Sequence, residues 1–157
     1  MPRITPFLWF DDKAEEAMTF YVSLFKDSKV LNVSRYGEAS PGQPGRAMTV
    51  TARIAGQEVT ALNGGPQFPF TEAFSFLVNC ESQQEVDDLW KKLTDGGEES
   101  QCGWLKDRYG LSWQIVPTVL GELLGDKDPV KAGRVMQAML QMKKIDIGGL
   151  KRAYQQA

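Results

Sequence analysis

The sequence predicts an α+β fold in which a βαβββ module occurs twice and a helical extension follows. An internal repeat is the first reason: residues 10–25 and 78–93 align without gaps, and both pass from an apolar extended run through a polar turn into an amphipathic helix. The order of elements is the second reason, because three strand-like segments follow each of these helices. We therefore expect one domain made of three parts. Module one covers residues 3–66, module two covers 72–117 and the helical tail covers 119–157.

The first module opens with an apolar, β-rich segment at residues 4–10. Strand alternation places three of its side chains on one face: Thr5, Phe7 and Trp9. A helix is expected over residues 13–25, because apolar side chains recur there at helical spacing and two carboxylates at its entry, Asp11 and Asp12, suit a helix N-terminus. Three strands complete the module, at 30–36, 47–54 and 58–62.

The second module repeats this order. A strand at residues 73–79 leads to Ser82, which forms a capping-box pattern with Glu85 and predicts a helix start. A glycine pair at 96–97 is expected to end that helix. Asp107 is expected to shape the turn before the last strand. Three short strands are predicted, at 98–102, 103–106 and 111–116.

The tail contains helical patterns. Leu120 lies in the first of them, and the caps Asp128 and Asp146 predict the starts of two more helices. An apolar stripe runs along the tail through Val135, Met139 and Met142. Methionines at this spacing are typical of a core or an interface, so we do not interpret them as a ligand set.

Composition excludes several function classes. The chain is 42% hydrophobic and 24% charged, which is typical of a globular protein and argues against disorder. Its net charge of −2 and scattered basic residues favour no nucleic-acid partner. No apolar run approaches the ~20 residues that span a bilayer, and the N-terminus lacks a signal core, so no membrane partner is expected. Two cysteines are too few for a disulfide framework, and we expect a cytoplasmic protein.

Several stretches resemble the PhnB-like family of the vicinal oxygen chelate superfamily, which includes glyoxalases, bleomycin-resistance proteins and dioxygenases. They are I-T-P-F-L-W-F, A-M-T-F-Y-V-S-L-F, A-L-N-G-G-P, V-N-C-E-S-Q-Q-E-V-D-D-L-W, C-G-W-L-K-D-R-Y-G-L-S-W-Q-I-V-P and D-P-V-K-A-G-R-V-M-Q-A-M-L-Q-M-K-K. The resemblance implies that the two modules form a curved mixed sheet around a cup, with helices outside. It also implies a homodimer. Many such proteins carry the label 3-demethylubiquinone-9 3-methyltransferase.

The superfamily's enzymes usually hold a divalent metal in the cup with His and Glu or Gln ligands. Carried over strand by strand, the ligand positions fall near Thr5, on Ala61 or Asn63, near Ala73 or Ser75, and on Gln114. These side chains are neutral, and the chain contains no histidine. Neutral amides and hydroxyls offer a transition metal neither charge nor strong donation. We therefore predict a cup without a metal ion and no cofactor.

The expected ligand-binding cup has a neutral hydrogen-bonding floor and aromatic walls. Its predicted residues are Thr5, Phe7, Trp9, Asn63, Ser75, Cys102, Trp104 and Gln114. Alternatives remain for three of them. Gln114 is equally well interpreted as a satisfied buried amide, and Trp9, like Trp113, as a core residue. Cys102 is interpreted as structural or oxidisable rather than nucleophilic, because the chain has no histidine to serve as its base.

These observations predict a metal-independent protein that binds a small molecule. The alternative is an enzyme of the same superfamily, with the methyltransferase label or a lyase or isomerase activity. A typical methyltransferase holds S-adenosylmethionine with a glycine-rich turn between a strand and a helix. The glycine pairs of this chain do not fit that context, because one precedes a proline at 64–66 and the other ends a helix at 96–97. The sequence therefore favours binding and leaves enzymatic activity as the second hypothesis.

Overall fold

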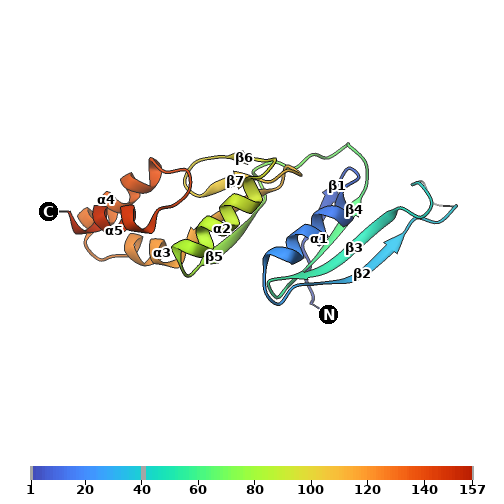
Figure 1. The fold of residues 1–157 in the computed structure, drawn as a ribbon, viewed down its shortest axis with the longest axis horizontal. Coiled ribbons are helices and arrows are strands. Elements are labelled where there is room, and N and C mark those ends of the chain that lie inside the picture. The colour runs from blue at the N-terminus through green and yellow to red at the C-terminus, as the bar shows by residue number, and fades with distance from the viewer. Residues whose placement is uncertain (1, 40–41, 157) are drawn as a thin grey trace. The chain divides into compact units, whose positions relative to one another are not determined.

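The computed structural model describes residues 2–39 and 42–156 (Figure 1). The chain divides into two compact units, Met1–Phe70 and Thr71–Ala157. Each unit contains a four-stranded mixed sheet, and the described residues form five helices. The predicted α+β class and its helical extension are therefore confirmed. That the two modules together form one cup stays a prediction.

Unit 1 contains one helix and one sheet with strand order β1-β4-β3-β2. Its elements are β1 (Phe7–Phe10), α1 (Ala14–Leu24), β2 (Lys29–Arg35), β3 (Ala47–Ile54) and β4 (Gln57–Asn63). β1 runs parallel to β4, and the other neighbouring strands are antiparallel. The first strand is shorter than predicted and begins at Phe7. Pro6 precedes it and has no N–H to donate to the ladder.

The core of unit 1 lies between α1 and one face of this sheet. Alternation along the strands sends apolar side chains toward the helix, as Leu8 and Phe10 of β1 show with 3% exposure each. Met18 and Tyr21 of α1 are fully buried against that face. The stripe predicted for this helix is thus confirmed.

Unit 2 repeats the arrangement with strand order β5-β8-β7-β6. Its first elements are β5 (Ser75–Cys80), α2 (Gln83–Thr94), β6 (Glu98–Glu99), β7 (Trp104–Lys106) and β8 (Ser112–Pro117). β5 is parallel to β8, just as β1 is parallel to β4. The equal strand orders confirm that the sequence repeat is a structural repeat.

The start and end of α2 follow the predicted signals. Ser82 Oγ accepts a hydrogen bond from Glu85 N at 3.2 Å, as in a capping box. In a capping box the Glu side chain also accepts from the backbone N–H of the N-cap residue. Here Glu85 Oε2 accepts instead from the preceding residue, at 3.3 Å from Glu81 N. After Thr94 the chain turns through Gly96, whose φ of +76° suits glycine.

One predicted strand of module two is wrong in length. The strand expected over 98–102 ends at Glu99, because the chain turns back at Cys102 and Gly103. Both residues have positive φ, +59° and +85°, which a strand does not accommodate. β6 is therefore a two-residue edge strand.

The tail forms three helices, as predicted. They are α3 (Thr118–Leu124), α4 (Pro129–Leu140) and α5 (Ile147–Gln155). Asp128 and Asp146 cap the last two through bonds from Val130 N at 2.9 Å and Gly148 N at 3.2 Å. These helices enclose a small core of Leu120, Val135, Ile145 and Leu150, with Met139 and Met142 packed against it. The methionine stripe is thus part of a core.

Gln83, in the first turn of α2, fastens the tail to the rest of unit 2. Its Nε2 donates to Ile145 O at 3.0 Å, and its Oε1 accepts from Ile147 N at 2.8 Å. Lys144 adds an ion pair to Asp87 of α2 at 2.8 Å. The tail is therefore held to unit 2 by specific polar contacts as well as by its core. None of the helices in the described part of the chain is long and apolar enough to cross a membrane.

Candidate functional site

Each sheet has one face covered by a helix and one open face. In unit 2, the side chains of Phe76 and Val78 alternate with the open-face side chains of Ser75 and Leu77, and Leu77 is 54% exposed. The register places further residues on this open face. They are Trp104 and Lys106 of β7 and Ser112 and Gln114 of β8.

Three of the predicted cup residues meet on this open face. Gln114 Nε2 donates to Ser75 Oγ at 3.0 Å, and Trp104 is the cross-strand partner of Gln114. Gln114 is half-buried, so its hydrogen-bonded amide is still partly accessible from the open face. The structure therefore brings Ser75, Trp104 and Gln114 together. Their role in binding a ligand stays a prediction.

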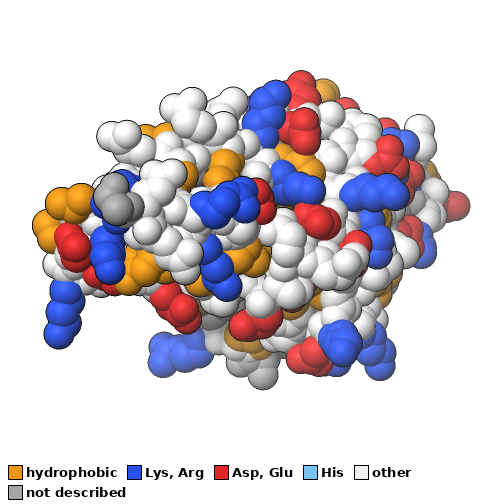
Figure 2. Space-filling model, turned by 60° about the vertical axis from the view of Figure 1, so that its left-hand side comes forward, with side chains coloured by type: hydrophobic (Ala, Val, Ile, Leu, Met, Phe, Trp, Pro, Cys, Tyr) orange, Lys and Arg blue, Asp and Glu red, His pale blue; other side chains and the backbone are white. Residues whose placement is uncertain are grey.

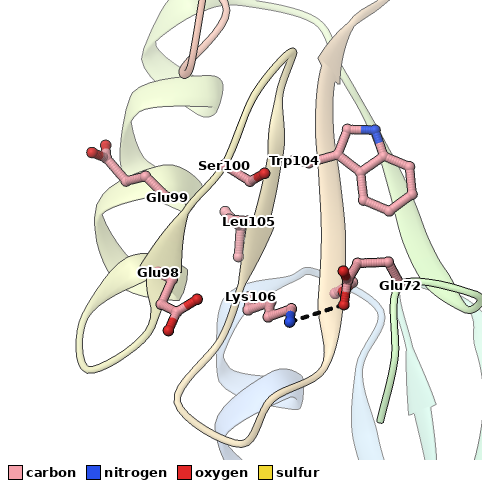
Figure 3. Close-up of a pocket in the computed structure, with 8 residues that line it drawn as sticks. Glu72, Glu98, Glu99, Ser100, Trp104, Leu105 and Lys106 are labelled. Carbon is pink, nitrogen blue, oxygen red and sulfur yellow. Dashed lines mark ion pairs between the residues drawn. The ribbon is translucent and has the colours of Figure 1, made fainter.

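A pocket of about 220 Å³ opens beside Trp104 (Figure 3). It is lined by Glu72, Glu98, Glu99, Ser100, Trp104, Leu105, Lys106 and Ser112. Lys106 and Glu72 point toward each other, with Lys106 Nζ 2.8 Å from Glu72 Oε1. The hydrogen bond and charge of Lys106 lower the pKa of Glu72, and Glu72 raises the pKa of Lys106 for the same two reasons.

Ser112 lines this pocket with an unusual hydroxyl. The residue is fully buried, and its Oγ has no hydrogen-bond partner among the described residues. Buried polar groups are normally paired, because an unpaired one has lost its water without compensation. No sequence pattern indicates this hydroxyl, since a serine between apolar residues is equally well interpreted as a core position.

Asp107 is buried next to this region but has a structural role. Its Oδ1 accepts from Tyr109 N at 2.9 Å and Leu111 N at 3.1 Å. Its Oδ2 accepts from Trp113 Nε1 at 2.9 Å, and Trp113 is 1% exposed. The turn predicted around Asp107 and the core position predicted for Trp113 are both confirmed.

The open face of unit 1 carries Phe7, Trp9 and a group of hydroxyls. Phe7 is 59% exposed, Trp9 is half-buried, and Thr5 lies just before β1. Trp9 Nε1 donates to Gly65 O at 2.9 Å. Sequence reasoning did not single out the hydroxyls, which bond in pairs across the strands. The pairs are Ser34 with Thr49 and Thr51 with Thr60, at 2.5 and 3.0 Å.

Asn63 lies on the other face of the unit 1 sheet, beneath α1. It is 7% exposed; its Oδ1 accepts from Ala14 N at 2.8 Å, and its Nδ2 donates to Ala47 O at 3.0 Å. The predicted capping of α1 by Asp11 or Asp12 is wrong, because the N-cap residue makes no side-chain bond and Asn63 supplies the acceptor instead. Asn63 also lines a pocket of about 480 Å³, together with Tyr36 and Arg46. Ligand contact by Asn63 stays a prediction.

The two cysteines occupy different environments. Cys102 is half-buried in the turn before β7, and its N–H donates to Met142 O at 2.8 Å. This turn therefore helps to hold the tail. Cys80 is buried at the end of β5, and desolvation, followed by the charge of Glu85, raises its thiol pKa to about 12. Its burial and raised pKa therefore argue against a nucleophilic role for the Cys80 thiol.

Comparisons with known proteins identify the family. The model of the 3-demethylubiquinone-9 3-methyltransferase family matches residues 2–116. A solved structure of a PhnB protein from Bacillus cereus, which bears the same methyltransferase label, is 39% identical with a TM-score of 0.70. The alignment covers 74% of this chain and 100% of that one. The chain belongs to this PhnB-like family.

More distant structures share the fold of the family. Protein PA1353 from Pseudomonas aeruginosa is 20% identical with a TM-score of 0.61, over 74% of this chain and 98% of that one. The fosfomycin resistance protein FosX from Listeria monocytogenes, solved with Mn(II) and sulfate, is 14% identical with a TM-score of 0.52. That alignment covers 78% of this chain and 94% of the FosX chain. No curated protein matches the sequence.

The residues of this PhnB-like chain do not fit the metal site of the superfamily. Within residues 2–39 and 42–156, no three His, Cys, Asp or Glu side chains are grouped so that they could hold a metal ion. At the positions carried over from the superfamily, Ser75 and Gln114 bond to each other through neutral groups. Such groups are poor ligands for a transition metal.

The surface charge is mixed. On the face drawn in Figure 2, basic and acidic side chains lie among one another without a large patch of one sign. A protein that binds nucleic acid through phosphates needs clustered Lys and Arg. This face therefore gives no support to a nucleic-acid partner.

Proposed function

We propose that this protein binds a small molecule, without a metal ion, on the open face of the unit 2 sheet. The observation that carries the proposal is the neutral Gln114–Ser75 pair, which stands where the superfamily places metal ligands. Trp104 lies next to this pair and lines the adjoining pocket. A few polar groups beside an aromatic wall are typical of small-molecule sites.

A ligand screen by thermal shift tests this proposal. We expect compounds that stabilise the EDTA-treated protein, because a ligand that binds the folded state raises its stability. Gln114→Ala removes one hydrogen-bonding group and is expected to lower the affinity of those compounds by about tenfold. Gln57→Ala is the matched control, because Gln57 is an exposed glutamine of unit 1. Compounds that bind after added Mn²⁺ and not before it would overturn metal independence.

An enzyme with the family's methyltransferase activity is the second candidate, and the family match favours it. The strand-to-helix connections argue against it. The β1–α1 connection at 11–13 and the β5–α2 connection at 81–82 contain no glycine. A glycine-rich turn at such a position lets the backbone approach a nucleotide closely. Calorimetric binding of S-adenosylmethionine, with methyl transfer to an acceptor panel, would establish the enzyme and reject simple binding.

A lyase or isomerase is the other form of the enzymatic candidate. It needs a group that moves a proton at the ligand. Asp107 is committed to backbone and indole bonds, so the carboxylates near the open face are Glu72 and Glu98. Turnover of a screened compound that Glu98→Gln abolishes would favour this candidate over binding alone.

We also propose a homodimer and a cytoplasmic location. The dimer is expected from the superfamily resemblance, and light scattering on the purified chain measures it directly. The location is expected from the two free cysteines, Cys80 and Cys102. Cell fractionation tests it.

A further inference from the structure

The pocket beside Trp104 carries an excess of negative charge. Two carboxylates, from Glu72 and Glu98, face the single ammonium of Lys106, so the formal charges leave an excess of one negative charge. Lys106 is already neutralised by Glu72 at 2.8 Å. The Glu99 carboxylate accepts from Trp90 Nε1 of α2 at 2.6 Å and therefore lies toward the helix-covered face of the sheet. An anionic ligand would therefore meet repulsion here, whereas a cation would be attracted.

Comparison of the two repeats shows that Ser112 lacks the hydrogen-bond partner that its counterpart in unit 1 has. The pairs Phe10–Asn63 and Val78–Ile115 are equivalent in the two sheets, so Thr60 of β4 corresponds to Ser112 of β8. Thr60 Oγ1 is bonded to the hydroxyl of its cross-strand partner Thr51 at 3.0 Å.

In unit 2, the residue opposite Ser112 is Lys106, whose ammonium is bound to Glu72 instead. The hydroxyl of Ser112 is thus buried and unpaired, in a residue that lines the pocket. It has a lone pair available for an N–H group of a ligand. The acidic lining and this free acceptor point to the same ligand chemistry.

We propose that this pocket binds the protonated amine of a small organic molecule, with Ser112 Oγ and the Glu98 carboxylate accepting its N–H groups and Trp104 contacting its apolar part. An aromatic ring near an ammonium adds a favourable electrostatic contact. The volume of about 220 Å³ is below the roughly 300–1,000 Å³ of sites that enclose a whole ligand. The pocket therefore suits the amine-bearing end of a ligand. This inference rests on the proposed small-molecule function and names its ligand class.

Three probes that share one ring separate the charge classes: benzylammonium, benzyl alcohol and benzoate. Each is titrated into ¹⁵N-labelled wild-type protein while the amide signals of Ser112 and Lys106 and the indole signal of Trp104 are followed. We expect benzylammonium to shift these signals with an affinity about fivefold above that of the alcohol, and benzoate to bind most weakly. High salt should reduce the difference in affinity between benzylammonium and benzyl alcohol, because it screens charge.

Two variants test the named acceptors. Glu98→Gln should weaken benzylammonium binding by about fivefold, and Ser112→Ala by about threefold to tenfold. Glu122→Gln is the matched control, since Glu122 is an exposed carboxylate of α3 outside the pocket. Equal or tighter binding of benzoate would overturn the inference. Absence of benzylammonium-induced shifts at millimolar excess would overturn it too.

The failure of this inference differs from failure of the proposed function. If the screened ligands are neutral or anionic and their binding still depends on Gln114, the proposed small-molecule function is supported and the amine is rejected as its ligand class. A screen without any stabilising compound, together with silent titrations, would reject both.

Discussion

Replacing Asn63 by alanine should destabilise the protein strongly, because its amide joins α1 to the sheet. The side chain makes two bonds to the backbone, from Ala14 N at 2.8 Å and to Ala47 O at 3.0 Å, in a site that is 7% exposed. Truncation leaves both backbone groups without these partners. Each such loss costs about 1–2 kcal/mol, so we expect about 2–4 kcal/mol in the free energy of unfolding.

Urea unfolding monitored by tryptophan fluorescence measures this effect. For a protein of this size, each kcal/mol lowers Tm by about 2–4 °C, so thermal unfolding should show a loss of roughly 5–15 °C. Asn32→Ala is the control, since Asn32 is an exposed asparagine of β2 and should change stability by about 0.5 kcal/mol or less. An Asn63→Ala protein as stable as the control would refute the structural role. Lost ligand binding at unchanged stability would restore the site role predicted from the sequence.

Three further predictions concern a turn, a thiol and an ion pair. Ala55 has a φ of +49° in the β3–β4 turn, so Ala55→Asn should raise the free energy of unfolding by about 0.5–1 kcal/mol in urea titrations. Iodoacetamide should modify Cys102 in the folded protein, and Cys80 only after unfolding, as mass mapping of the labelled peptides would show. Hydrogen bonds from Lys144 and Gln83 lower the pKa of Asp87 in the folded state. The ionised carboxylate of Asp87 therefore stabilises the folded protein above about pH 4, and this contribution is lost as the pH falls through the lowered pKa of the folded state. Asp87→Asn should therefore flatten the acid limb of the stability profile, and an unchanged limb would contradict this.

Most of the fold was predictable because local signals and periodicity agree in this chain. The caps at Ser82, Asp128 and Asp146 each mark a helix start, and their bonds are present. The errors occur where a distant residue or a turn decides the outcome. The acceptor for α1 comes from Asn63, 49 residues from Ala14, and no local pattern indicates it.

The candidate site was predictable in part. Alternation correctly grouped Phe7 with Trp9. The positions carried over from the superfamily resemblance led to Ser75 and Gln114, which lie on one face with the predicted wall residue Trp104. The charged pocket was missed, because its residues come together only through the strand register. Glu72 and Lys106 are far apart in sequence and meet through an ion pair that neither position announces. The unpaired state of a buried hydroxyl is likewise a property of its surroundings rather than of its residue type.

Comparison of the two repeats shows where their chemistry has diverged. The faces under the helices match, since Ala61 and Trp113 both lie buried beneath a helix. The open faces differ: where unit 1 pairs Thr51 with Thr60, unit 2 has a lysine bound elsewhere and a serine without a partner. An unpaired buried hydroxyl reduces stability by about 1–3 kcal/mol, so packing alone does not account for it. The ligand amine proposed above would complete this hydrogen bond, and the difference between otherwise equivalent sheets is why we propose unit 2 rather than unit 1 as its binding place.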